Sequence, residues 1–158
     1  MDALTLLKED HKEVMGMLEQ LEKTSEKSAQ KREQLFGKLV KELTVHEKIE
    51  QEIFYPAVQE KAKTKQLKEL VIESYLEHKL VDDIKADIQG TPFESEEWGP
   101  KLKIMMENIK HHAMEEEEQN MFPKVRELFS KQELDDLGAQ MAEMKETESA
   151  ASPQPLRP

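Results

Sequence analysis

The sequence HEKIEQEIFYP at residues 46–56 returns in approximate form as HAMEEEEQNMFP at residues 112–123. Each copy contains a His, a Glu four residues later and, at its end, an aromatic residue followed by Pro. Positions i and i+4 of a helix lie one turn apart on the same face. If both copies are helical, each directs an imidazole and a carboxylate toward one point, and two such pairs facing one another would form a metal site.

The composition predicts a single domain built from helices. The chain has 158 residues, of which 36% are charged and only 5 are Gly. Charged and apolar residues are interspersed at helical spacing, which is typical of amphipathic helices in a bundle. A chain of this length can bury a substantial core as one domain. We therefore expect an all-α protein.

Charge and residue usage exclude several kinds of partner. The formal net charge of -11 would repel nucleic acid and an anionic membrane surface. The chain has no Cys, which excludes disulfides and thiolate metal sites. It has no signal-peptide core at its N-terminus and no apolar run near the roughly 20 residues that a membrane span needs. We expect a cytoplasmic protein that binds neither nucleic acid nor membranes.

The spacing of apolar residues predicts four long helices and a shorter fifth. The third is expected to end at Gly90 as a C-cap, and Pro56 is expected to kink or break the second. The sequence SKQE at residues 130–133 has the form of a capping box and predicts the start of the fifth. The expected organisation is an up-down-up-down four-helix bundle at residues 1–129, a short additional C-terminal helix at 130–147 packed on or beside it, and a disordered tail at 148–158.

Each of the four long helices carries one His on its apolar stripe near mid-length. These residues are His11, His46, His78 and His112. Any one of them has a simpler interpretation, as a core imidazole satisfied by one hydrogen bond. Two of the helices, however, add a Glu one turn further on, and burying a carboxylate is costly unless it is paired or coordinates a metal. A purely structural bundle without metal would need protein partners for both carboxylates.

The available ligand types restrict which metal ions the site could bind. Imidazole and carboxylate without thiolate suit iron, manganese or zinc. Carboxylates from facing helices can bridge two metals roughly 3.5–4 Å apart, which favours a dinuclear centre. The Glu-x-x-His motif of ferritin-like di-iron bundles and the His-Glu-x-x-His motif of zincins are both absent from the sequence.

Taken together, these motifs resemble those of the hemerythrin-like (HHE cation-binding) domains, and the resemblance runs from about Leu4 to Phe129. The residues that carry it are Asp10-His11-Lys12, His46 with Glu50 and Tyr55-Pro56, Glu77-His78, and His112 with Glu116 and Phe122-Pro123. The resemblance implies a four-helix bundle with two non-haem iron ions. It also implies terminal ligands at the four histidines and bridging carboxylates at Glu50 and Glu116.

The sequence departs from the oxygen-carrying members of that family in the third helix. Those members have two His four residues apart on this helix, whereas in this chain the residue four before His78 is Ser74. Glu47, beside His46, is a candidate for an additional metal ligand, as a carboxylate is in some family members that sense iron. Its simpler interpretation is a solvated helix residue. A centre richer in carboxylate favours the ferric state, which argues against reversible oxygen transport.

The two motif copies also differ by one residue in length. Ten positions separate His46 from Pro56, whereas eleven separate His112 from Pro123. One inserted residue is commonly absorbed as a π-bulge near a functional site. His111 with Glu115 is therefore a competing metal pair, but the apolar residues before His112 match those before His46. We predict His112 with Glu116 as the inward pair.

The resemblance implies a protein that binds or reductively handles dioxygen, peroxide or nitric oxide at its di-iron centre. Both a peroxide- or oxygen-reactive enzyme and a protein without turnover fit this interpretation. The alternative is an iron- or oxygen-responsive regulatory module, in which metal stabilises the bundle and a partner reads the folded state. The C-terminal helix is the candidate surface for such a protein partner.

Overall fold

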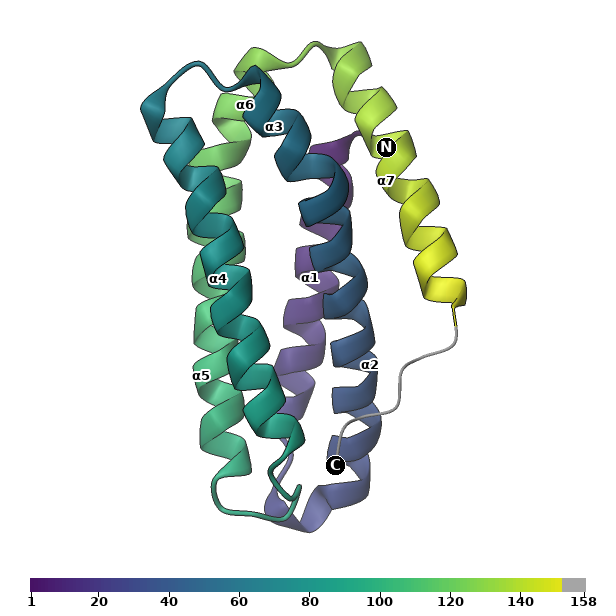
Figure 1. Ribbon diagram of the computed structural model, residues 1–158. Helices are drawn as coiled ribbons and strands as arrows, with labels where there is room; N and C mark the ends of the chain where they lie inside the picture. The colour runs from purple at the N-terminus through teal and green to yellow at the C-terminus, as the bar shows by residue number, and fades with distance from the viewer. Residues whose placement is uncertain (152–158) are drawn as a thin grey trace.

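A computed structural model describes residues 1–151 and shows a helix bundle. The helices are α1 (Ala3–Glu22), the 3-10 turn η1 (Glu26–Ser28), α2 (Ala29–Ile49), η2 (Glu50–Phe54), α3 (Tyr55–Lys61), α4 (Lys65–Gln89), α5 (Trp98–Lys110), η3 (His111–Met121), α6 (Phe122–Leu128) and α7 (Lys131–Ala150). The chain runs up and down through four long columns, which are formed by α1, by α2 with η2 and α3, by α4, and by α5 with η3 and α6. Helix α7 lies along the outside (Figure 1). The predicted all-α bundle with a fifth helix is confirmed, although that helix continues to Ala150. The rest of the predicted tail, 152–158, lies outside the described residues.

The prolines of the two motif copies do not interrupt their columns. The second column is continuous through α2, η2 and α3, and the fourth through α5, η3 and α6. The segments η2 and η3 are π-helices, and each leads into a short α-helix with a Pro in its first two positions. Pro56 has no N–H to donate to the carbonyl of Gln51, five residues earlier, and that carbonyl accepts a hydrogen bond of 3.3 Å from the hydroxyl of Tyr75 instead. The second copy absorbs its extra residue in a π-helical segment, as expected.

The apolar core is divided into two clusters, one toward each end of the bundle. The cluster around the chain connections at the α3 and α6 end includes Leu4, Leu7, Ile49, Phe54, Phe122 and Met121. The cluster at the other end includes Val14, Leu18, Phe36, Leu39, Trp98 and Met105. Burying each large apolar side chain contributes roughly 1.5–3 kcal/mol to stability. In the first, third and fourth columns the predicted histidine falls between the residues of one cluster and those of the other, and in the second His46 lies at the same boundary, directly after Val45. The histidines therefore form a polar layer within the core.

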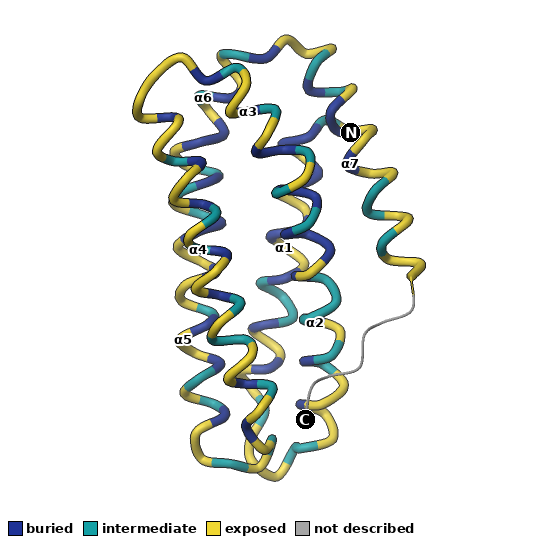
Figure 2. Tube along the Cα trace, in the orientation of Figure 1, coloured by how far each residue is buried: buried dark blue, intermediate teal, exposed yellow. Residues whose placement is uncertain are grey.

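Helix α7 packs against α1 and α2 on the side of the bundle away from α4 and α5 (Figures 1 and 2). Ser130 and Glu133 form the predicted capping box at its start. Its buried face adds Leu134, Leu137 and Met141 to the apolar cluster at that end. None of the described helices combines the length and apolarity that a membrane crossing requires.

The close approach of α7 to the N-terminus depends on a glycine. A Cβ at Gly138 would lie 2.4 Å from the carbonyl oxygen of Met1 and 2.8 Å from the amide nitrogen of Ala3. Both neighbours are backbone atoms and cannot rotate away, so any side chain at this position would separate α7 from α1.

We expect the substitution Gly138→Ala to destabilise the protein by about 1–3 kcal/mol, because overpacking forces the backbone to move. Gly16→Ala in α1 is the matched control, since no atom lies within 4 Å of a Cβ at that position. That control should be neutral or gain up to ~1 kcal/mol from helix propensity. Denaturant unfolding followed by circular dichroism measures both changes, and equal stability of the two variants would contradict the packing described.

Candidate metal centre

The polar layer in the core contains four histidines and two glutamates. They are His11, His46, Glu50, His78, His112 and Glu117, and all six are buried. The two glutamates have no exposed surface. Each of the four columns of the bundle contributes a His, and the second and fourth columns also contribute a Glu. The structure therefore brings together all four predicted histidines and Glu50.

The ring nitrogens and carboxylate oxygens converge in two overlapping groups. His11, His46, Glu50 and Glu117 form one group, and Glu50, His78 and His112 form the other. Oε1 of Glu50 lies 3.1 Å from Nε2 of His46 and 3.0 Å from Nε2 of His78. Glu50 therefore belongs to both groups and links them.

The second glutamate has an equivalent position on the opposite side of the layer. Oε1 of Glu117 lies 3.0 Å from Nε2 of His11 and 3.6 Å from Nε2 of His112. Each glutamate thus contacts one histidine from each group. A carboxylate that binds two cations must lie between the other ligands of the two, and both glutamates have such a position.

Several of the converging atoms lack a hydrogen-bond partner. Both oxygens of Glu50, Oε1 of Glu117 and Nε2 of His11 are buried and, among residues 1–151, approach one another or other histidine nitrogens without forming a hydrogen bond. A buried carboxylate without partners is strongly destabilising, whereas a bound cation satisfies it. The donor set of imidazole and carboxylate also suits iron, manganese or zinc. The residues present therefore fit a metal site.

The pKa values of His11 and Glu50 reflect the same need for positive charge, whereas burial lowers the pKa of His112. Burial acts to lower the pKa of His11, but hydrogen bonds to Glu117 and Glu118 outweigh it and raise the pKa to about 9. Burial acts to raise the pKa of Glu50, yet the charge of His46 holds it well below its usual range. The charged form of Glu50 is thus stabilised by a cationic partner, which can be either a protonated histidine or a metal ion.

The outward-facing nitrogen of each ring is held by a second residue. Nδ1 of His11 lies 2.6 Å from Glu118, that of His46 3.0 Å from Asp10, that of His78 2.9 Å from Gln51, and that of His112 3.2 Å from Glu77. The carboxylate partners can accept the N–H of a ligating His, which fixes the ring and leaves its other nitrogen free for the metal, and Gln51 does the same for His78 when its amide oxygen faces Nδ1. In this structure all four Nε2 atoms face the glutamates.

The structure differs from the sequence prediction in which glutamate faces inward. Glu117 is buried in the layer, whereas Glu116 lies 3.1 Å from Nε2 of His111 at the edge of the bundle. The reason is the π-helix, in which hydrogen bonds join residues i and i+5 and the residue one turn after His112 is therefore Glu117. A signal was present in the sequence, because Glu50 and Glu117 both stand six residues before the Pro of their motif copy.

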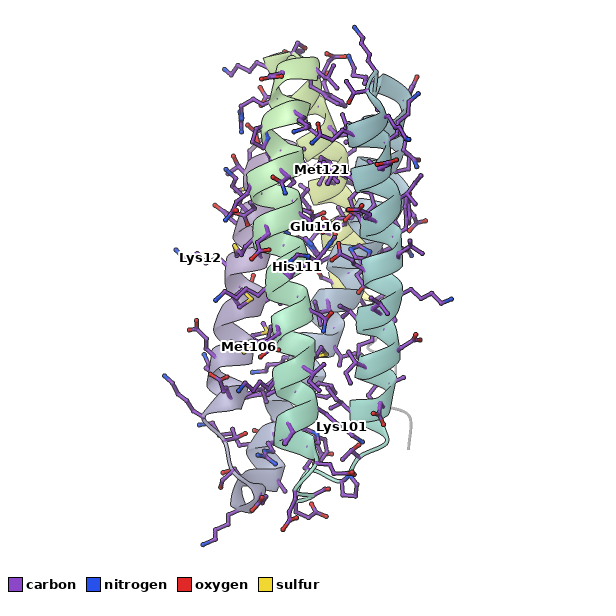
Figure 3. All side chains as sticks on the ribbon, turned by 90° about the vertical axis from the view of Figure 1, so that its left-hand side faces the viewer. Lys12, Lys101, Met106, His111, Glu116 and Met121 are labelled. Carbon is purple, nitrogen blue, oxygen red and sulfur yellow. The ribbon has the colours of Figure 1, made fainter. Side chains whose placement is uncertain are left out.

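The competing pair, His111 and Glu115, lies on the surface. His111 is about half exposed, with 51% of its side chain accessible, and its Nδ1 is 2.7 Å from Glu115. Figure 3 shows His111 and Glu116 at mid-height on the face formed by α4, α5 and η3. His111, Glu116 and Glu77 form a small group of their own, outside the buried layer.

The candidate additional ligand, Glu47, is buried beside the layer but belongs to neither group. Burial, together with a hydrogen bond to Asp82, raises the pKa of its carboxyl group to about 8. Glu47 is therefore largely protonated near neutral pH, unlike Glu50 one turn later on the same column. The simpler interpretation of Glu47 as a solvated residue does not hold either, because only 9% of it is exposed.

Tyr55 is a site residue whose role the sequence analysis did not assign. Its hydroxyl donates a hydrogen bond of 2.5 Å to Glu117 and lies 3.3 Å from Nε2 of both His78 and His112. Ser74, the residue four before His78, is also fully buried, and its hydroxyl donates a hydrogen bond to the carbonyl of Leu70. Tyr55 follows Glu50 by five residues across a π-helix, and this spacing could have revealed that both share a face.

Comparisons with known proteins agree with this geometry. Residues 2–125 match the family model described as the Hemerythrin HHE cation binding domain. The fold is similar to the crystal structure of a hemerythrin HHE cation binding domain-containing protein from Mycobacterium kansasii, with a TM-score of 0.82 and 27% sequence identity. That likeness covers 94% of this chain and 88% of the other. No protein of curated function matches the sequence significantly.

The positions of Glu116 and Glu117 lead to a matched pair of variants. We expect Glu117→Gln to lose most of the metal that the wild-type protein retains, because it removes an inward carboxylate charge. Glu116→Gln should retain the wild-type metal content, since its side chain lies outside the buried layer. Elemental analysis after gel filtration measures both. Loss of metal from the Glu116 variant alone would contradict the register described.

Proposed function

The chain belongs to the hemerythrin HHE cation-binding family, and we propose that it holds two non-haem iron ions and binds or reductively handles dioxygen, peroxide or nitric oxide. The observation that carries this proposal is the pair of buried glutamates, Glu50 and Glu117, each between two histidines with unsatisfied oxygens. Two carboxylates in such positions call for two cations rather than one.

The proposed ligands follow from the two groups of converging atoms. His11 and His46 would hold one iron, and His78 and His112 would hold the other. Glu50 and Glu117, each near one histidine of each pair, would contribute carboxylate oxygens to both. When bound, a reduced iron pair supplies two electrons and an open coordination position to a small ligand. The protein contributes the fixed donor set, the orientation of each ring and the exclusion of bulk water.

Tyr55 is the residue we propose as the additional donor in place of the missing histidine. Its oxygen converges with Nε2 of His78 and of His112, whereas Glu47 lies in neither group. Burial and the charge of Glu117 raise the pKa of the phenol well above its usual value. Loading the site with metal would therefore release the phenolic proton, as ligand deprotonation requires.

The surroundings of the layer restrict what can reach it. The four histidines are each at most 6% exposed, and apolar clusters close the layer from both ends of the bundle. The ring of Phe122 stacks on His11 at 6.2 Å between centroids, with an interplanar angle of 13°. This enclosure excludes large substrates and supports a diatomic molecule or peroxide as the proposed ligand.

Iron loading tests the proposal directly. Protein loaded anaerobically with Fe(II) and then exposed to air should contain about two irons per chain and show the near-ultraviolet bands of a carboxylate-bridged diferric pair. The loaded protein should also consume added hydrogen peroxide, measured with an oxygen electrode or a peroxide assay. One zinc or no metal per chain would overturn the di-iron centre. Stable di-iron loading without peroxide turnover would instead favour the regulatory module.

The assignment of Tyr55 has its own spectroscopic test. A phenolate bound to ferric iron gives a charge-transfer band in the visible, and we expect Tyr55→Phe to abolish that band. Glu47→Gln is the matched control on the same column, and it should leave both the band and the iron content unchanged. Loss of iron from the Glu47 variant, with an unchanged Tyr55→Phe spectrum, would assign the additional ligand to Glu47 instead.

A further inference from the structure

Helix α7 contacts the outer side of the metal centre through one lysine. Nζ of Lys145 donates to Oδ1 of Asp10, and the other oxygen of Asp10 lies 3.0 Å from Nδ1 of His46. The inward nitrogen of the same ring lies 3.1 Å from Glu50. An unbroken chain of polar contacts therefore runs from the C-terminal helix to a proposed iron ligand and on to a bridging carboxylate.

The burial of Asp10 makes its contact with Lys145 important. Asp10 is only 1% exposed, so a carboxylate oxygen that loses its partner there is not compensated by bulk water. Glu13 and Glu42 converge with Asp10 in one acidic group, and Lys145 also lies 3.8 Å from Glu42. Among the described residues, Lys145 is the lysine or arginine that forms an ion pair with Asp10.

Other contacts bind α7 to the bundle without reaching the centre. Lys48 on α2 forms an ion pair with Glu148 at 2.7 Å, and Gly138 allows α7 to approach α1 closely. Lys48 is 42% exposed and does not contact Asp10. The chain thus offers two lysines that both bind α7 to the bundle, of which only Lys145 is connected to a proposed ligand.

We propose that Lys145 is a positioning residue of the metal centre: it fixes Asp10, which orients His46, so that docking of α7 and binding of metal stabilise one another. This inference rests on the proposed function. The residues that orient a ligating histidine commonly change metal affinity 10–100-fold when removed. Because linkage is reciprocal, metal that is held more tightly when α7 is docked must also hold α7 more tightly.

Lys145 affects metal affinity in two opposite ways. Its positive charge repels a nearby cation, so removing that charge would raise the affinity. Its contact with Asp10 orients His46, so losing that contact would lower the affinity. The direction of the change therefore separates the two effects. Lys145→Arg keeps the charge and the capacity to donate to Asp10, so it serves as the conservative rescue.

The first test compares Lys145→Met with Lys48→Met after metal loading. We expect loss of Fe(II) to a coloured chelator to be roughly 10–100-fold faster in Lys145→Met than in the wild type. Lys48→Met should lose iron at the wild-type rate, and Lys145→Arg should lie close to it. Cobalt(II) substituted into the site provides a second readout, because its visible absorption changes with ligand orientation, and only Lys145→Met should alter it.

The second test measures the reciprocal effect on α7. Hydrogen exchange followed by mass spectrometry should show that metal slows exchange in peptides from residues 131–150 of the wild type. The same protection should appear in Lys48→Met and be reduced in Lys145→Met. Thermal melts of the metal-free variants show whether each is folded. If Lys145→Met does not fold, Lys145→Gln, which is shorter and lacks the positive charge, replaces it in both tests.

The outcomes distinguish this inference from the function on which it rests. Wild-type protein that retains no metal would overturn both. Wild-type loading with equal or slower iron loss in Lys145→Met would overturn the positioning role alone, as would equal effects of the two lysine variants. Faster loss confined to Lys145→Met, with rescue by Lys145→Arg and loss of metal-dependent protection in α7, would support it.

Discussion

Two carboxylates in the core have no access to water, and the rest of the structure depends on supplying positive charge beside them. Glu50 and Glu117 are both fully buried, and their ion-pair partners in the described chain are histidines. A third buried glutamate shows the alternative solution, because Glu47 has its pKa raised to about 8 and holds a proton near neutral pH. Glu50 instead keeps its charge beside His46 and His78. The fold must therefore hold cationic partners at the inner pair, and this is the role proposed for metal.

The helices are built around that requirement. The polar layer lies between two apolar clusters, so the burial that stabilises the bundle also isolates the glutamates from solvent. The π-helical segments η2 and η3 bring residues five apart onto one face, which aligns Glu50 with Tyr55 and His112 with Glu117. Such segments are uncommon, and their occurrence at this layer is consistent with a functional constraint on the backbone.

Periodicity was sufficient to predict the helices, the fifth helix with its capping box, and the histidine on each of the four columns. It was insufficient inside η3, because the i+4 rule for an α-helix selects Glu116 whereas the π-helix turns Glu117 inward. Tyr55 was missed for a related reason, since its relation to Glu50 is apparent only at a spacing of five. The contact between Lys145 and Asp10 could not be predicted, because 36% of the chain is charged and the pairing depends on where α7 docks.

Anomalous diffraction from crystals of the iron-loaded protein, collected near the iron absorption edge, would locate the metal ions. We expect two peaks within the buried layer, both beside Glu50 and Glu117. One peak should lie at the Nε2 atoms of His11 and His46, and the other at those of His78 and His112. A single peak in the layer, or peaks confined to the surface group of Glu77, His111 and Glu116, would contradict this expectation.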